Sequence, residues 1–172
     1  MFEFAQWLEL TQISVTIKSV KWIVPAVQSV HIITIGIVFV SLLSIAMRVL
    51  GWTRMDQAFS VVMARFTPWV RNGLVVLALT GGTLVVGEPI RELMSLSVWL
   101  KLSLIAVGAT SAWLFSRSLR PLVRTGREPQ FSPAMKTAAM ATVLLWLAII
   151  FLGRAIAYDV EVWGGLSFSP RA

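Results

Sequence analysis

The sequence predicts an all-α integral membrane protein, a four-helix bundle with an N-terminal interfacial helix. Three observations predict this class. Four apolar stretches are each about as long as the roughly 20 residues that a helix needs to cross the hydrocarbon layer. Of the 172 residues, 57% are hydrophobic and 13% are charged, against about 25% charged in an average soluble domain. Lysine and arginine gather in two of the connections. The chain is therefore expected to form a single membrane domain over residues 1–172.

The first predicted elements are the N-terminal segment and the first span. Residues 2–20 mix apolar side chains with Glu, Gln, Thr, Ser and Lys, and this loosely amphipathic pattern predicts a helix near the membrane surface. An extension of the first span into water would fit the same residues. The first span covers 23–50, and His31 is the ionisable side chain in its apolar run. Pro25 fits the first turn of this helix or a kink in it.

Three further spans follow the first. The second covers 67–87, the third covers 93–115 and the fourth covers 134–158. Lys101 lies inside the third span, and Arg154 lies near the end of the fourth. The connections between the spans are short, which fits one bundle without a second, water-soluble domain.

The positions of the basic residues predict the orientation of the bundle. The segment 48–71 carries four arginines and the segment 117–136 carries five lysines or arginines, whereas the connection between spans two and three carries Arg91 alone. Cytoplasmic loops of membrane proteins are enriched in Lys and Arg. The first and third connections are therefore predicted to be cytoplasmic, in a bacterial inner (plasma) membrane, with both termini in the periplasm.

Three ionisable side chains inside the spans are the candidate site: His31, Lys101 and Arg154. In the predicted orientation all three lie in the outer half of the membrane, His31 about 12 Å deep at 1.5 Å per residue. Ionisable groups at such depths usually face the bundle interior and have partners. We therefore expect one polar pocket between the helices, open to the periplasm. Neighbours that could extend the set are Gln28, Thr80, Tyr158 and Glu161.

Each of the three residues also has an interpretation without a ligand. Lys101 could extend its ammonium group to the membrane surface, and Arg154 could anchor the end of its helix. His31 could be a neutral, hydrogen-bonded residue of the core. The shared depth of the three side chains favours the pocket.

Composition and motifs weaken several classes of function. The chain has no cysteine, which excludes disulfides and thiolate sites. The net charge of +7 is explained by the basic connections, so no nucleic-acid partner is predicted. No enzyme motif is present, and enzyme activity is not expected. No cofactor and no metal is predicted. His31 is a weak candidate ligand for haem, or for copper together with Met94. It is weak for haem because bis-histidine ligation needs a second histidine.

The order of several short motifs resembles a family of small bacterial inner-membrane proteins known as a domain of unknown function. The motifs are Trp22, Pro25 and His31, then 47–51 (MRVLG), Pro68-Trp69, Thr80-Gly81-Gly82, 99–102 (WLKL), Trp146 and 153–158 (GRAIAY). The resemblance covers nearly the whole chain and implies four spans in a bacterial plasma membrane. More distantly, the arrangement is similar to four-helix proteins of the cytochrome-b and copper-resistance-D kind, although their multiple histidines are missing here.

These observations predict a function only in outline. The first hypothesis is a small membrane subunit that binds a partner or a small ligand in the outer polar pocket. The second is an electron-transfer module that uses haem or quinone. The third is an oligomeric transporter or channel subunit, since four helices make too little wall for a wide pore. The expected partners are the lipid bilayer and either further copies of the chain or another membrane protein.

Overall fold

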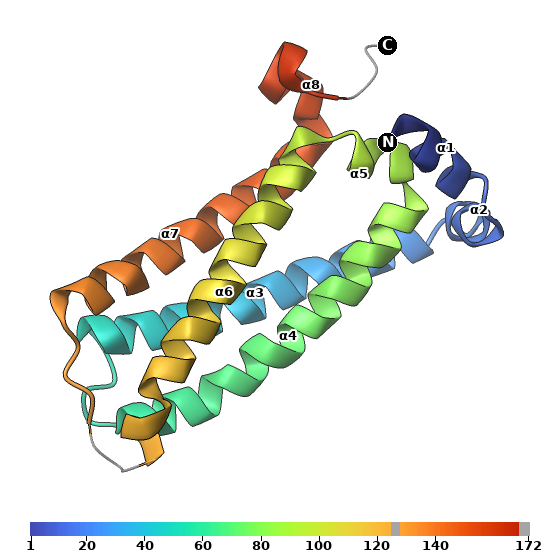
Figure 1. Ribbon diagram of the computed structural model, residues 1–172. Helices are drawn as coiled ribbons and strands as arrows, with labels where there is room; N and C mark the ends of the chain where they lie inside the picture. The colour runs from blue at the N-terminus through green and yellow to red at the C-terminus, as the bar shows by residue number, and fades with distance from the viewer. Residues whose placement is uncertain (125–127, 169–172) are drawn as a thin grey trace.

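A computed structural model describes residues 1–124 and 128–168, and every regular element in these residues is a helix (Figure 1). The elements are α1 (Phe2–Glu9), α2 (Gln12–Ser19), α3 (Ile23–Leu50), α4 (Phe59–Gly87), α5 (Pro89–Leu93), α6 (Leu96–Arg124), α7 (Pro133–Ala155), η1 (Ile156–Tyr158), α8 (Asp159–Trp163) and η2 (Gly164–Leu166). Four segments are long and apolar enough to cross a membrane: Ile23–Leu50, Phe59–Gly87, Leu96–Leu114 and Pro133–Leu166. The predicted fold class is confirmed, and the four apolar helices indicate a multi-pass membrane protein.

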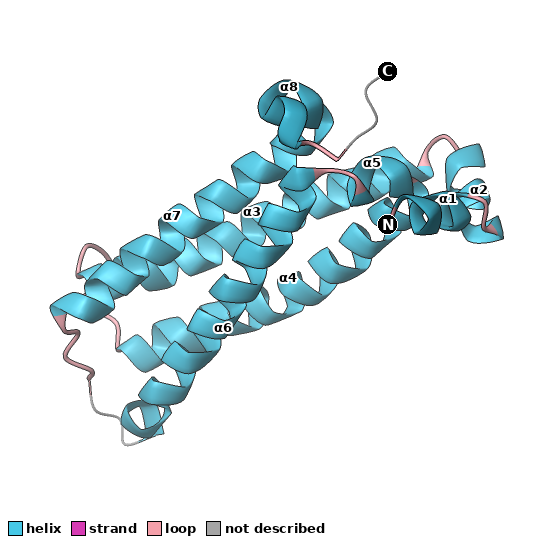
Figure 2. Cartoon of the chain, turned by 45° about the horizontal axis from the view of Figure 1, so that its top comes forward, coloured by secondary structure: helices cyan, strands magenta, loops and turns pink. Residues whose placement is uncertain are grey.

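The four long helices α3, α4, α6 and α7 run side by side in an elongated bundle, with the short helices gathered at one end (Figures 1 and 2). We call this end, with α1, α2, α5 and α8, the α8 end. The opposite end holds the connections 51–58 and 128–132, and we call it the loop end. Among the basic residues of the third connection, Arg127 and the side chains of Arg120 and Arg124 lie outside the described residues.

The long helices pack in the order α4, α3, α7 and α6, whereas α4 and α6 meet only weakly. The centre of the bundle is a cluster of Val38, Trp146 and Ile149, with partly buried aliphatic residues around it. Gly73 of α4 lies directly against the Val38 side chain, so that a Cβ at this position would collide with Val38 Cγ2. Small residues of this kind let helices approach closely in lipid, and Gly73 explains the tight pairing of α3 with α4.

Several boundaries differ from the sequence prediction; α6, for example, continues to Arg124 where the third span was predicted to end at 115. Helix α4 begins at Phe59 and not at 67, because its first turns are held by packing that hydropathy does not report. Phe59 is fully buried, and its ring lies edge-on to the ring of Phe131 at a centroid distance of 5.0 Å. The predicted N-terminal helix is divided into α1 and α2, and the Thr11 side chain caps α2 by accepting a hydrogen bond from the Ser14 amide.

Candidate functional site

Near the α8 end, a histidine of α3 is hydrogen-bonded to a threonine of α4. Nδ1 of His31 lies 2.6 Å from Oγ1 of Thr80. The Cε1 atom of the same ring lies 3.6 Å from the position that a Cβ of Gly81 would occupy. The imidazole therefore packs closely against α4, and a larger residue than glycine at position 81 would press on it. The ring remains half-buried rather than fully enclosed.

The hydrogen bonds of the Thr80 hydroxyl group favour one tautomer of His31. Thr80 Oγ1 donates its single hydrogen to the carbonyl oxygen of Val76, at 2.8 Å. With that hydrogen used, the same oxygen can accept from His31, in the tautomer that carries its hydrogen on Nδ1. Nε2 of His31 is consequently left as an acceptor or a ligand atom.

Lys101 of α6 extends toward the same region. Its Nζ atom lies 3.5 Å from the position that a Cβ of Gly153 in α7 would occupy, so glycine at this point leaves space for the ammonium group. Lys101 is half-buried and interacts electrostatically with His31 and with Glu92 of α5. We refer to His31, Thr80 and Lys101 as the polar cluster. It joins three of the four long helices through two groups that are costly to place in lipid.

The other predicted site residues lie at the same end but outside this cluster. Arg154 is exposed, and its guanidinium carbon lies 5.5 Å from the ring centroid of Tyr158, a cation–π contact on the bundle surface. Glu161 is exposed as well, and Gln28 is partly buried one turn before His31. Thus Lys101 interacts electrostatically with His31, whereas Arg154 has a separate, superficial position.

The carboxylate of Asp159 is buried and has a role that the sequence did not predict. It accepts hydrogen bonds from the Ser95 and Ser97 hydroxyls, each at 2.7 Å, and from the Ser97 amide at 3.0 Å. The Leu96 amide and the Ser167 hydroxyl also donate to it, at 3.2 and 2.6 Å. Asp159 therefore caps the N-terminus of α6 from α8. The two serines before an apolar run were the available signal, since serine is typical of helix starts.

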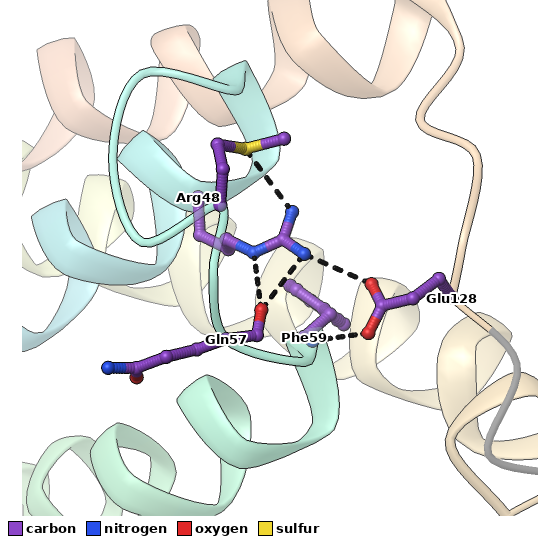
Figure 3. Close-up of polar contacts among 5 residues, drawn as sticks. Arg48, Gln57, Phe59 and Glu128 are labelled. Atoms are coloured by element: carbon purple, nitrogen blue, oxygen red, sulfur yellow. Dashed lines mark hydrogen bonds and ion pairs between the residues drawn. The ribbon is translucent and has the colours of Figure 1, made fainter.

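A second such group lies at the loop end (Figure 3). Arg48 of α3 is buried and donates to the Gln57 carbonyl oxygen, from Nε at 3.2 Å and from Nη2 at 3.1 Å. Nη2 also lies 3.0 Å from the carboxylate of Glu128. The other oxygen of Glu128 accepts from the Phe59 amide at 2.9 Å, at the start of α4. The sequence showed Arg48 as one basic residue of a connection, whereas the structure makes it the centre of a buried polar contact.

Comparison of the chain with protein-family models, with curated proteins and with solved structures gives no match. The resemblance to a family of small inner-membrane proteins therefore stays a prediction.

The polar cluster can offer a ligand one cationic donor and one imidazole acceptor. The ammonium group of Lys101 suits a carboxylate or a carbonyl oxygen, and Nε2 of His31 suits a hydroxyl or amide hydrogen. Haem would fit only in part. Nε2 has the free electron pair that iron needs, but His31 is the single histidine in the sequence, so a second histidine ligand must come from another chain.

Proposed function

We propose that this chain is a multi-pass protein of the bacterial inner membrane with both termini in the periplasm. The charge distribution supports this orientation, because the basic connections lie at the loop end and basic loops stay in the cytoplasm. The surface of α1 and α2 supports an interfacial position for the N-terminal segment. Its exposed apolar residues include Phe2, Phe4, Trp7, Leu10, Ile13 and Val15.

Within that topology, we propose that the chain is a small membrane subunit whose polar cluster binds a small ligand with a carboxylate or carbonyl group. One observation carries this proposal: Lys101, half-buried in α6, interacts electrostatically with His31 of α3 within the bundle. A cation at the centre of a membrane helix costs about 2.5–3.5 kcal/mol on insertion scales, and Lys101, in the second turn of α6, bears part of this cost. A ligand oxygen would repay part of that cost and would also reach the imidazole.

The charges around the cluster set the polarity of this ligand. Glu92 faces Lys101 and would oppose a strongly anionic ligand, but its carboxylate is shared with Arg91, whose Nη2 lies 3.3 Å away. Arg91 is paired in turn with Glu88 at 2.5 Å. The cluster therefore suits one carboxylate or a neutral carbonyl better than a phosphate with two negative charges.

The proposal is tested by mass spectrometry of small molecules that remain bound after purification in mild detergent. We expect the wild-type protein to retain such a molecule and the Lys101→Met variant to lose it. Lys136→Met is the matched control, since this exposed lysine lies at the loop end. Equal retention by a folded Lys101→Met variant, or no bound molecule in the wild type, would contradict the proposal.

The tautomer of His31 that leaves Nε2 without a hydrogen favours a second candidate function, an electron-transfer module. Nε2 carries the electron pair that could ligate haem iron, and a quinone carbonyl could accept a hydrogen bond from Lys101. A haem Soret band that disappears in His31→Ala would support this candidate. A spectrum without visible absorption, together with a retained small acid, would support the first.

A further inference from the structure

The fourth apolar segment is longer than a membrane crossing requires. It covers Pro133–Leu166, 34 residues, whereas about 20 residues are enough for a helix to cross the hydrocarbon layer. Helix α7 alone provides 23 residues. The short helices η1, α8 and η2 follow, in residues 156–168, which we call the post-α7 segment. The apolar sequence thus continues beyond the length of a single crossing.

Two close contacts show how α7 is aligned with α6. Nζ of Lys101 lies 3.5 Å from the position that a Cβ of Gly153 would occupy. Nearer the middle of the bundle, Cδ2 of Leu145 lies 3.0 Å from the position that a Cβ of Gly108 would occupy. Because α6 and α7 run in opposite directions (Figure 1), the last residues of α7 are level with the first turn of α6.

The start of α6 lies at the edge of the predicted membrane layer. The apolar part of α6 is Leu96–Leu114, and its 19 residues are close to the minimum for a crossing. Exposed tryptophans, Trp99 and Trp113, lie near its two ends, as in the aromatic belts of membrane proteins. Side chains that are level with residues 95–97 are therefore expected at the boundary between hydrocarbon and headgroups.

The carboxylate of Asp159 holds the post-α7 segment at this boundary. It accepts hydrogen bonds from the hydroxyls of Ser95 and Ser97, at the start of α6. It also accepts from the Ser167 hydroxyl, at 2.6 Å, so one carboxylate fixes both the start of α8 and the residue after η2. Nε1 of Trp163 donates to Oγ of Ser97 at 2.8 Å. The chain therefore returns to the start of α6 instead of extending away from the membrane.

The side chains that this segment exposes are mainly apolar. Leu166 and Phe168 flank Ser167, and they are 68% and 54% exposed. Tyr158 and Val162 are exposed as well. Helix α8 packs against α6 and η1 at the periphery of the bundle, away from α1 and α2 (Figures 1 and 2). At this depth and on this side of the bundle, the surrounding medium is lipid.

The charged groups of this region fit the same depth. Glu161 is exposed between Val160 and Val162, and an ionised carboxylate is costly inside the hydrocarbon layer. Arg154 lies against the Tyr158 ring, and its long side chain can reach the headgroups from the last turn of α7. Glu161 therefore limits α8 to the level of the headgroups, where apolar and charged side chains can both be accommodated.

We propose that the post-α7 segment is a second interfacial anchor, which binds the lipid surface at the α8 end of the bundle. Its lipid-facing side chains are Tyr158, Val162, Leu166 and Phe168. The bundle end would then be attached to the lipid surface at two places, since α1 and α2 pack against α4 and α5 instead. This anchor requires a membrane-embedded bundle, but it depends neither on the proposed small ligand nor on which side is the periplasm.

The test measures the depth of spin labels on the full chain in vesicles of phosphatidylethanolamine and phosphatidylglycerol. Nitroxides are attached at Val162→Cys and Leu166→Cys, two exposed positions in a chain without other cysteines. Oxygen concentrates in lipid and a nickel chelate stays in water, so the power saturation of the electron paramagnetic resonance signal reports depth. We expect both labels to be more accessible to oxygen than to the nickel chelate. If either variant does not fold, Phe168→Cys tests the same surface.

Two control positions calibrate the measurement. A label at Leu79→Cys, on the exposed surface of α4, should favour oxygen strongly, and a label at Asp56→Cys, in the connection after α3, should favour the nickel chelate. Labels of the post-α7 segment that behave like the one at Asp56→Cys, while Leu79→Cys remains in lipid, would overturn the anchor and leave the membrane assignment intact. Access of the nickel chelate to Leu79→Cys as well would overturn both.

Discussion

At each end of the bundle a carboxylate caps the start of a long helix, but the two carboxylates have different surroundings. At the α8 end, the carboxylate of Asp159 caps the start of α6; at the loop end, the carboxylate of Glu128 caps the start of α4. Asp159 is 5% exposed and is surrounded by neutral donors. Glu128 has a side chain that is 52% exposed and is paired with the buried Arg48. A carboxylate can thus be buried when hydroxyls and amides satisfy it, whereas a buried arginine here requires a carboxylate that reaches in from the surface.

We expect the largest loss of stability from a substitution at the α8 end. Replacement of Asp159 by alanine would leave the hydroxyls of Ser95 and Ser97 and the first amides of α6 without their acceptor. Each unsatisfied buried donor costs about 1–3 kcal/mol, so we expect a loss of at least about 3 kcal/mol in the free energy of unfolding. The measurement is chemical unfolding in detergent micelles, followed by circular dichroism.

The control for this experiment is Glu161→Ala. Glu161 is an exposed carboxylate of the same short helix, and its loss should change stability by less than about 0.5 kcal/mol. Equal stabilities of the two variants would show that the Asp159 cap does not hold α6.

A smaller effect is expected from Glu128→Ala at the loop end, about 2 kcal/mol, because Arg48 would lose a charged partner while keeping the Gln57 carbonyl oxygen. The same change in an Arg48→Met background should cost clearly less, since no buried cation remains. A double-mutant cycle with unfolding free energies measures this coupling. If the two costs simply add, the ion pair between Arg48 and Glu128 does not account for the contact.

The smallest effect is a difference in salt dependence. The Debye length falls to about 3 Å at 1 M salt, so the partly exposed pair of Glu128 with Arg48 should weaken by less than about 1 kcal/mol. The cap made by Asp159 should hardly respond. Comparing the salt dependence of unfolding in the two alanine variants separates these behaviours. The interpretation would be wrong if Asp159→Ala reduced the salt dependence of the unfolding free energy more than Glu128→Ala does.

Hydropathy predicted the four long helices because lipid requires long, uncharged segments with internally satisfied backbones. It did not predict that α4 starts at Phe59, since that boundary depends on packing against Phe131, which is distant in sequence. The depth of His31 and Lys101 along their helices predicted that both lie in the same half of the bundle, and the two side chains interact electrostatically. Depth does not determine which face of a helix a residue occupies, and for this reason the superficial position of Arg154 could not be predicted.

The two capping carboxylates were beyond sequence reasoning for a related cause. Asp159 and Glu128 act on helix starts that are more than sixty residues away in the chain. Their sequence neighbourhood shows only an acidic residue near a helix end. The partner of such a group depends on how the bundle folds, and local patterns do not contain that information.

In the proposed topology, the α8 end and the loop end lie on opposite sides of a membrane, with the α8 end in the periplasm. Since the chain has no cysteine, single cysteines at Gln6 in α1 and Thr53 in the connection after α3 can be labelled without background. In intact spheroplasts, a membrane-impermeant maleimide should label Gln6→Cys and leave Thr53→Cys unlabelled until the membrane is opened. Labelling of Thr53→Cys in sealed spheroplasts would contradict the account.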